Sequence, residues 1–221
     1  METTSLQEQA YKIIRKKIIY SDLAPGQRIL RTELEESLGI GRTPIREALV
    51  QLRKQELIYA VPQSGTYISK INLESAENAR FAREQLERKI FAECLTRIDE
   101  TGEKMLQGII EKQEKAVETK NARDFFYYDN VFHETCYTIA NRKEIWGWLS
   151  ANSIHLDRFR WLRVATKEMR WEKVIGQHET IMNAIYNKDI DELDFVMTIH
   201  LHMMLDEKEF VISRYPDYFV E

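Results

Sequence analysis

The sequence predicts a mainly α-helical protein of two domains: a small domain of three helices and a hairpin over residues 1–72, and an antiparallel all-α bundle of about six helices over residues 73–221. Pro216 is the only proline after Pro62, so most of the long second segment can be helical. Charge also changes along the chain. Eleven Lys and Arg oppose eight Asp and Glu through Asn72, whereas the remainder is acidic.

The first two helices are expected within residues 5–22 and 32–39. Apolar residues recur at helical spacing in the first and form one stripe: Leu6, Ala10, Ile13, Ile14 and Ile18. In the second, Thr32 and Glu35 stand three residues apart, as in a capping box. Gly39 follows and provides a left-handed helix end. This short helix therefore has signals for both of its ends.

The third helix is expected from Thr43, as the N-cap, to about residue 55, with Pro44 at the first helical position. One face of this helix is apolar and predicted to be buried: Ile45, Ala48, Leu49 and Leu52. Residues 57–71 then form two β-rich runs around the turn PQSG. Three helices and a hairpin in about 70 residues are the pattern of a winged helix-turn-helix.

The opposite face of the third helix begins with Arg42, Thr43 and Arg46. Arginines at a helix N-terminus are unfavourable for the helix alone, because like signs meet there. An Arg-rich helix start is usually a solvated face. Here, however, it lies between a short helix and a hairpin tipped by Gly65, which could reach a minor groove. We therefore predict double-stranded DNA as the ligand, since guanidinium forks bind guanine and backbone N–H groups bind phosphate.

The run YSDLAPGQRILRTELEESLGIGRTPIREALVQLRKQELIYAVPQSGTYI resembles the DNA-binding domain of the GntR family of bacterial transcription regulators. The shared features are a Leu-x-Pro-Gly turn, the Thr-Pro-x-Arg-Glu-Ala-Leu helix and a Gly-tipped wing. This resemblance implies a homodimer on a palindromic operator. It also implies that Arg31 meets the DNA backbone or a base edge, that Arg42, Thr43 and Arg46 read the major groove, and that Gly65 lets the wing approach the minor groove.

The chain departs from the family pattern at two positions. Gly41 stands where Ser or Thr usually precedes the arginine, which removes one phosphate-binding hydroxyl and is expected to weaken or retune binding. Glu56 stands where a helix-ending glycine is common. Neither change threatens the fold.

The region from Leu73 onward is expected to form helices near 74–98, 101–119, 122–140, 143–165, 168–187 and 190–211. The turns between them are marked by Thr101-Gly102, Asn121, Asn141 and Lys188-Asp189. Cys94 and Cys136 lie far apart in helical contexts, so they provide no disulfide framework.

Asp129 and His133 are four residues apart, so both project from one face of a helix. His178 and His200 lie on later amphipathic helices, where a single histidine is more often a core residue than a ligand. Helices that each direct an imidazole or carboxylate inward nevertheless build metal sites in bundles. The region is similar to the FCD-type effector domain of GntR regulators. That resemblance implies that these four residues bind a divalent metal; three nitrogens and one oxygen suit Zn²⁺, Ni²⁺ or Mn²⁺.

The FCD resemblance also implies a small organic acid as effector, bound beside the metal and held by an arginine. Arg83 matches the family's Arg-x-x-Leu-Glu pattern, and Arg158 and Arg163 are the other candidates. Each has an ordinary alternative role, because Arg83 can pair with Glu87 one turn on and the other two can lie on the surface.

Three alternatives to an effector-controlled, metal-binding regulator are considered. Two histidines and a carboxylate can form the facial triad of an iron oxygenase, and the metal can instead be purely structural or itself the signal. No phosphate-binding loop or hydrolase elbow is present, and we expect a regulator rather than an enzyme. The sequence has no leader pattern and no apolar run of the roughly 20 residues that a bilayer span requires, which predicts a cytoplasmic protein without membrane contact.

Overall fold

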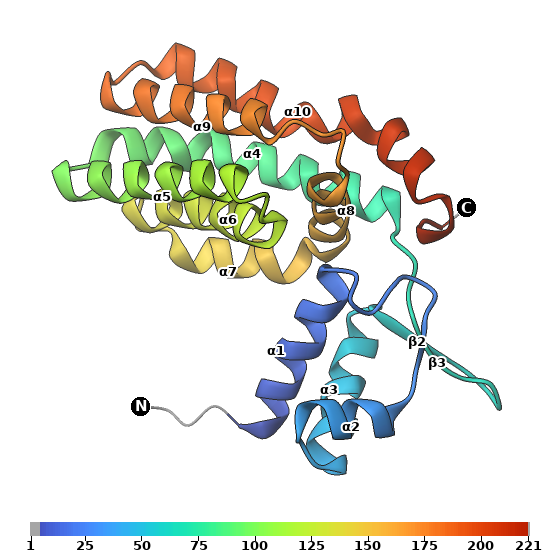
Figure 1. The fold of residues 1–221 in the computed structure, drawn as a ribbon. Coiled ribbons are helices and arrows are strands. Elements are labelled where there is room, and N and C mark those ends of the chain that lie inside the picture. The colour runs from blue at the N-terminus through green and yellow to red at the C-terminus, as the bar shows by residue number, and fades with distance from the viewer. Residues whose placement is uncertain (1–4, 221) are drawn as a thin grey trace. The chain divides into compact units, whose positions relative to one another are not determined.

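A computed structural model describes residues 5–220, which form two compact units (Figure 1). One unit contains the chain through Leu73 together with the segment from Tyr215 onward, and the other contains Glu74–Arg214. None of the described helices is both long and apolar enough to span a membrane.

The first unit has three helices, three short strands and a terminal turn. Their bounds are α1 Leu6–Ile19, β1 Arg28–Ile29, α2 Arg31–Leu38, α3 Arg42–Lys54, β2 Ile58–Val61, β3 Gly65–Ile68 and η1 Pro216–Tyr218. The predicted helices and hairpin are therefore confirmed. On α1, Ala10, Ile14 and Ile18 are buried as expected, whereas Leu6 and Ile13 of the predicted stripe are exposed.

The predicted starts of α2 and α3 are wrong. Helix α2 begins at Arg31 with Leu30 as its N-cap, so Thr32 lies inside the helix, and Glu35 pairs with Arg31 rather than closing a capping box. Helix α3 begins at Arg42 after Gly41, and neither helix has a side-chain cap. In each case the helix begins before the threonine, so the threonine lies inside the helix and cannot be its N-cap. The predicted end at Gly39 is confirmed by its left-handed backbone, with φ at 63°.

Glu56 follows the last turn of α3 in a left-handed conformation, with φ at 59°. A residue with a Cβ is strained there and glycine is not. We expect Glu56→Gly to stabilise the first unit by about 0.5–1 kcal/mol, the released strain outweighing the entropy gained by the unfolded chain. Amide exchange in α3 measures this. The matched change Lys54→Gly, one position inside the helix, is expected to destabilise by about 1 kcal/mol; equal effects of both changes would contradict the assignment.

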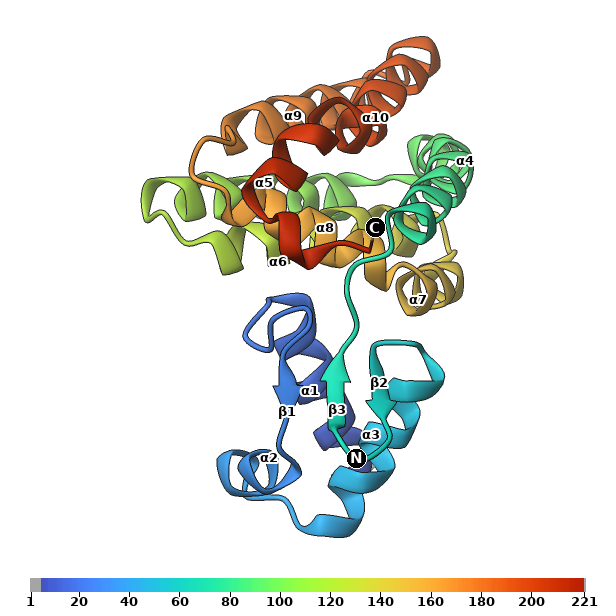
Figure 2. The same ribbon diagram turned by 90° about the vertical axis from the view of Figure 1, so that its right-hand side faces the viewer.

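The three strands form an antiparallel sheet in the order β1-β3-β2, visible in Figure 2. Isoleucines Ile29, Ile58 and Ile68 are buried on one face of the sheet. Beneath them, α1 packs against α3, and Ile45, Ala48 and Leu52 of α3 close the core. Leu49, the fourth residue of the predicted face, is half-buried.

The predicted second domain extended to residue 221. In the structure, the segment from Tyr215 onward belongs to the first unit and not to the bundle. Ile71 and Phe219 form a parallel bridge, in which the Ile71 N–H donates to the Tyr218 carbonyl at 2.8 Å and the Val220 N–H donates to the Ile71 carbonyl at 3.0 Å. Ile71 is fully buried and Phe219 nearly so. The chain therefore passes between the two units twice, after Leu73 and after Arg214.

The second unit contains seven helices among its described residues rather than about six. They are α4 Leu73–Arg97, α5 Glu100–Glu118, α6 Ala122–Ile139, α7 Lys143–Asn152, α8 Ile154–Ala165, α9 Trp171–Tyr186 and α10 Ile190–Arg214. The predicted helix 143–165 breaks at Ser153, whose hydroxyl donates to the Leu149 carbonyl. Thr101 and Gly102 do not form a turn, because Asp99 caps α5 by accepting from the Gly102 N–H.

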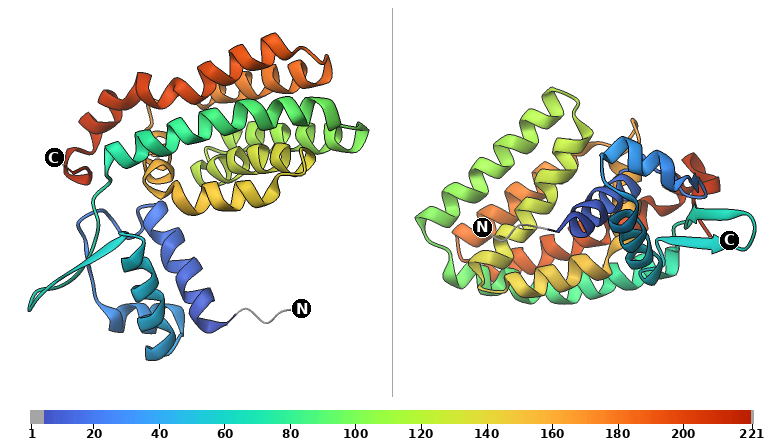
Figure 3. Two further views of the ribbon diagram at one scale, coloured as in Figure 1. Left: turned by 180° about the vertical axis from the view of Figure 1, so that it is seen from behind. Right: turned by 90° about the horizontal axis from the view of Figure 1, so that it is seen from below.

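Helix α4 runs along the bundle between α10 and α7, as Figure 3 shows. Ion pairs fix both sides: Arg88 binds Asp194 of α10 through two bonds, and Glu93 binds Arg142 at the start of α7. The helices α5, α6 and α9 pack around the interior. This arrangement directs one face each of α4, α5, α6, α9 and α10 to a common centre.

Candidate nucleic-acid interface and metal centre

The N-terminal half of α3 presents the predicted reading face. Arg42, Thr43 and Arg46 are exposed, while Ile45 and Ala48 point into the core of the first unit. Because the apolar face is fully occupied, the arginines have no interior in which to fold back. The geometry is that of a helix whose basic edge is available to a groove.

The arginines at this face differ in their pairing. Arg31 contacts the Glu35 carboxylate at 3.1 Å. In contrast, Arg42 and Arg46 form no ion pair with any residue between 5 and 220. A cation without an internal counter-charge is the one that gains most from an external phosphate or guanine.

Gly65 lies at the start of β3, and its φ of +143° is one that other residues rarely adopt. A Cβ built there would lie 2.8 Å from Nε of Arg28. The backbone conformation is what favours glycine here, and the Arg28 side chain lies against the space that a Cβ would fill.

The four candidate metal ligands come together in the second unit. Asp129 and His133 lie on α6, His178 on α9 and His200 on α10, and one ligand atom from each lies within 4.8 Å of all the others. His133 and His178 are fully buried, Asp129 is nearly so, and His200 is partly buried. Three helices thus converge on one point, as the four-residue pattern predicts.

Acceptors behind the histidines orient their rings. The His133 Nδ1 lies 3.0 Å from a carboxylate oxygen of Glu87, the His178 Nδ1 lies 2.9 Å from Oε1 of Gln113, and the His200 Nδ1 lies 3.0 Å from Oε1 of Gln177. Each oxygen only accepts, so each Nδ1 carries the proton. Every Nε2 is left with a lone pair directed at the centre, which is the tautomer that binds a metal.

The distances between the histidine nitrogens fit a metal ion bound among them. The Nε2 atoms of His133 and His200 are 3.2 Å apart, and the Nε2 of His178 is buried without a hydrogen-bond partner among the described residues. Lone pairs that face one another at this distance repel unless a cation lies between them. Two nitrogens bound to one zinc at roughly 2.0–2.1 Å lie about 3 Å apart, close to what is seen.

The surroundings of the four candidate ligands favour the protonation states that bind a metal. Burial lowers the pKa of His178 to about 3 and also lowers the pKa values of His133 and His200, so the imidazoles stay neutral near neutral pH. Burial alone would raise the pKa of Asp129, but Arg160 and the histidines hold it well below its ordinary value. The site therefore offers three neutral nitrogens and one carboxylate.

A cavity of about 70 Å³ opens beside Asp129 and His200. Apolar side chains of α6, α8, α9 and α10 form much of its wall, together with four arginines: Arg80, Arg83, Arg160 and Arg163. Each of the four binds an acid directly: Arg80 binds Glu84, Arg83 binds Glu87, Arg160 binds Asp129, and Arg163 binds Glu207. Nη2 of Arg83 is buried and has no hydrogen-bond partner within residues 5–220. The cavity thus combines an apolar wall with an unsatisfied guanidinium donor.

Both halves of this arrangement match known families. Residues 6–68 match the family model of the bacterial regulatory proteins of the gntR family, and residues 79–203 match that of the FCD domain. The chain belongs to the GntR family. It is a DNA-binding transcription regulator with an FCD domain.

Relatives of this GntR-family protein cover nearly its whole length. It is 28% identical to the HTH-type transcriptional repressor RspR of Escherichia coli K12, over 99% of this chain and 96% of that protein. It is 27% identical to the gluconate operon transcriptional repressor of Bacillus licheniformis, over 88% of this chain and 79% of that protein. The fold resembles that of E. coli McbR/YncC, with a TM-score of 0.81 at 18% identity over 96% of this chain and 100% of that one.

The structure of this GntR-family protein separates the three predicted effector arginines. Arg83 and Arg163 line the cavity, but Arg158 does not; it is fully buried elsewhere on α8. Arg160, two residues further on, takes the place expected of Arg158 and contacts Asp129, Asn130 and Asp157. The sequence carried no signal for this, since apolar and basic residues alternate around all of α8.

Proposed function

We propose that this regulator binds a palindromic operator as a homodimer and that a small carboxylate, bound beside a divalent metal in the second unit, controls its DNA affinity. The metal ligands are Asp129, His133, His178 and His200, and the metal is Zn²⁺, Ni²⁺ or Mn²⁺. The DNA-binding part is residues 1–72, and the bundle of α4–α10 binds effector and partner. The protein is cytoplasmic and not an enzyme.

The observation that carries the effector proposal is the unsatisfied Nη2 of Arg83 in a cavity that reaches His200 and Asp129. A buried N–H without an acceptor is costly, and a carboxylate oxygen satisfies it with a charge-assisted bond. A bound metal supplies a Lewis-acidic centre for the same carboxylate. The apolar wall sets the size of the acid, because the cavity holds only a few heavy atoms.

On the DNA side, Arg42, Thr43 and Arg46 read the major groove, Gly65 belongs to the wing, and Arg31, which is paired with Glu35, has the smaller role at the backbone. The effector acts only if it binds one arrangement of the bundle better than another. That preference then changes the separation of the two recognition helices in the dimer, which must match the spacing of the half-sites.

Metal content, unfolding and DNA affinity test this proposal together. Native mass spectrometry of the purified protein identifies the metal, and a thermal-unfolding screen of small carboxylates is run on the loaded protein and after EDTA treatment. All four tryptophans lie between residues 146 and 171, so their fluorescence reports on the bundle alone. We expect one or more acids to raise the melting temperature of the loaded protein only, and to change its affinity for DNA selected from a random pool.

Two variants test whether Arg83 binds the acid. Arg83→Lys keeps a positive charge beside Glu87 but loses the planar fork, so it should weaken the response to acid by roughly tenfold or more. Arg97→Lys, on an exposed face of the same helix, should leave the response unchanged. A large loss of stability with EDTA and no effect of any acid would instead establish a structural metal. Oxygen-dependent turnover of a 2-oxo acid would establish the facial-triad enzyme.

A further inference from the structure

The exposed face of the small sheet is basic and aromatic. Residues directly opposite one another in a sheet share a face, and Tyr67 stands opposite both Arg28 and Tyr59. Tyr59 and Tyr67 stack with ring centroids 5.6 Å apart, and the Tyr67 hydroxyl lies 2.6 Å from that of Ser64. Because the isoleucines of the strands are buried on the other face, this face is free to meet a ligand.

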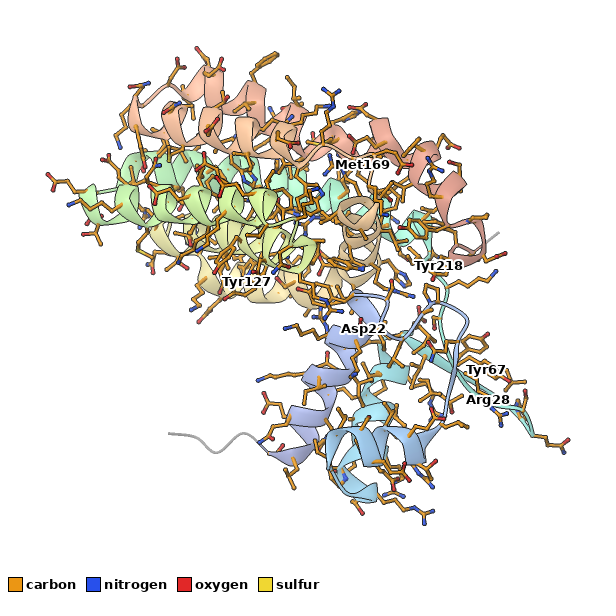
Figure 4. All side chains as sticks on the ribbon, in the orientation of Figure 1. Asp22, Arg28, Tyr67, Tyr127, Met169 and Tyr218 are labelled. Atoms are coloured by element: carbon orange, nitrogen blue, oxygen red, sulfur yellow. The ribbon has the colours of Figure 1, made fainter. Side chains whose placement is uncertain are left out.

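Arg28 projects from β1 on that face. Its side chain crosses diagonally from β1 toward the hairpin tip, where Nε lies over the backbone of Gly65. Figure 4 shows Arg28 and Tyr67 close together beside the hairpin. Arg28 is exposed and forms no ion pair with any residue of the described chain. It is a cation beside the hairpin tip that no acid among residues 5–220 neutralises.

We propose that Arg28 is a DNA-reading residue of the wing, and that its guanidinium enters the minor groove beside the hairpin tip. The negative potential of that groove attracts arginine, most strongly where A·T pairs make it narrow. Gly65 serves this contact by leaving room for the guanidinium, and the tyrosine stack supports the strand behind it. Arg28 therefore adds minor-groove selectivity to the major-groove reading of α3.

The test uses the full-length protein and a duplex that the wild type selects from a random pool. A second duplex has 2,6-diaminopurine in place of every adenine. This change adds an amino group to the minor groove and leaves the major-groove edge intact. Affinities of the wild type, Arg28→Ala and Arg28→Lys are measured by fluorescence anisotropy on both duplexes. Lys70→Ala is the control, because Lys70 is an exposed cation beyond the other end of β3.

We expect Arg28→Ala to bind the adenine duplex roughly tenfold more weakly than the wild type, and diaminopurine to weaken the wild type by a similar factor. Diaminopurine should have little further effect on Arg28→Ala. Arg28→Lys should lose the preference for adenine, and Lys70→Ala should keep it.

Two results would overturn the proposal. Undiminished binding of Arg28→Ala to the adenine duplex would remove Arg28 from the interface. An equal loss for Arg28→Ala on both duplexes would show a phosphate contact or a structural role instead. Amide exchange in β1 and β3 confirms that each variant is folded, so that a loss of binding is not a loss of the wing.

Discussion

Replacing Arg46 by alanine is expected to weaken binding to the selected operator by roughly 10- to 100-fold, because a bidentate contact to guanine is worth about 1–3 kcal/mol. Binding to unrelated DNA should fall much less, since only one charge is removed. Arg46 is exposed and touches no part of the core, so the free energy of unfolding should change by less than about 0.5 kcal/mol. Anisotropy titrations with operator and unrelated duplexes measure the ratio of the two affinities.

Arg97→Ala is the matched control for this experiment. Arg97 is also an exposed helical arginine, but it lies at the end of α4 in the second unit, and its ion pair among residues 5–220 is with Glu93. Its removal should leave both affinities unchanged. Unchanged selectivity in Arg46→Ala would reject α3 as the recognition helix, whatever the effect on total affinity.

Replacing Glu87 by glutamine is expected to lower the free energy of unfolding of the bundle by about 3–5 kcal/mol, because it leaves the buried Arg83 without its counter-charge. Glu87 is fully buried and joins Arg83 at 2.7 Å to His133 at 3.0 Å. It also lies beside His133, a proposed metal ligand, so metal affinity should fall by roughly 10- to 100-fold. Urea unfolding followed by tryptophan fluorescence and competition with a metal indicator measure the two effects.

The pH dependence gives an independent check on the same residue. Burial alone would raise the pKa of Glu87, but Arg83 and His133 hold it at about 2, below its ordinary 4.5. The carboxylate therefore stabilises the fold above pH 4.5, and this stabilisation is lost as pH falls toward 2. Glu87→Gln should lack that part of the acid transition in metal-free protein.

Glu93→Gln supplies the control for Glu87. The substitution and the helix are the same, but Glu93 forms its ion pair with Arg142 at the surface, where such pairs contribute about 1 kcal/mol or less. Equal losses in the two variants would show that the buried pair has no special role. A stable Glu87→Gln with normal metal affinity would remove Glu87 from the support of the metal centre.

Local spacing was enough to predict most of the helices and the hairpin, and spacing together with the family resemblance predicted the four residues that cluster in the bundle. The pair Asp129 and His133 is set by one helical turn, and His178 and His200 followed from their place on apolar helix faces together with the family resemblance. Helix starts were less predictable. Thr32 and Thr43 have the right chemistry for an N-cap, but the preceding turns place the N-caps two residues earlier, at Leu30 and Gly41.

The support of the site was beyond the reach of local pattern. Glu87, Gln113 and Gln177 come from three helices, and only packing brings them behind the histidine rings. Arg160 was missed for a different reason. Helix α8 is buried on several sides, so its polar residues do not reveal which face meets the cavity, and Arg158 and Arg160 point in different directions.

The pairing of Ile71 with Phe219 affects how the chain connects the two units and where a tag can be attached. Helix α10 carries His200 and ends at Arg214, and the residues that follow it pair with Ile71, between β3 and α4. The chain therefore connects the two units at two places rather than one. An affinity tag fused after the Ile71–Phe219 bridge would begin next to the first unit, so DNA measurements are better made on the untagged protein.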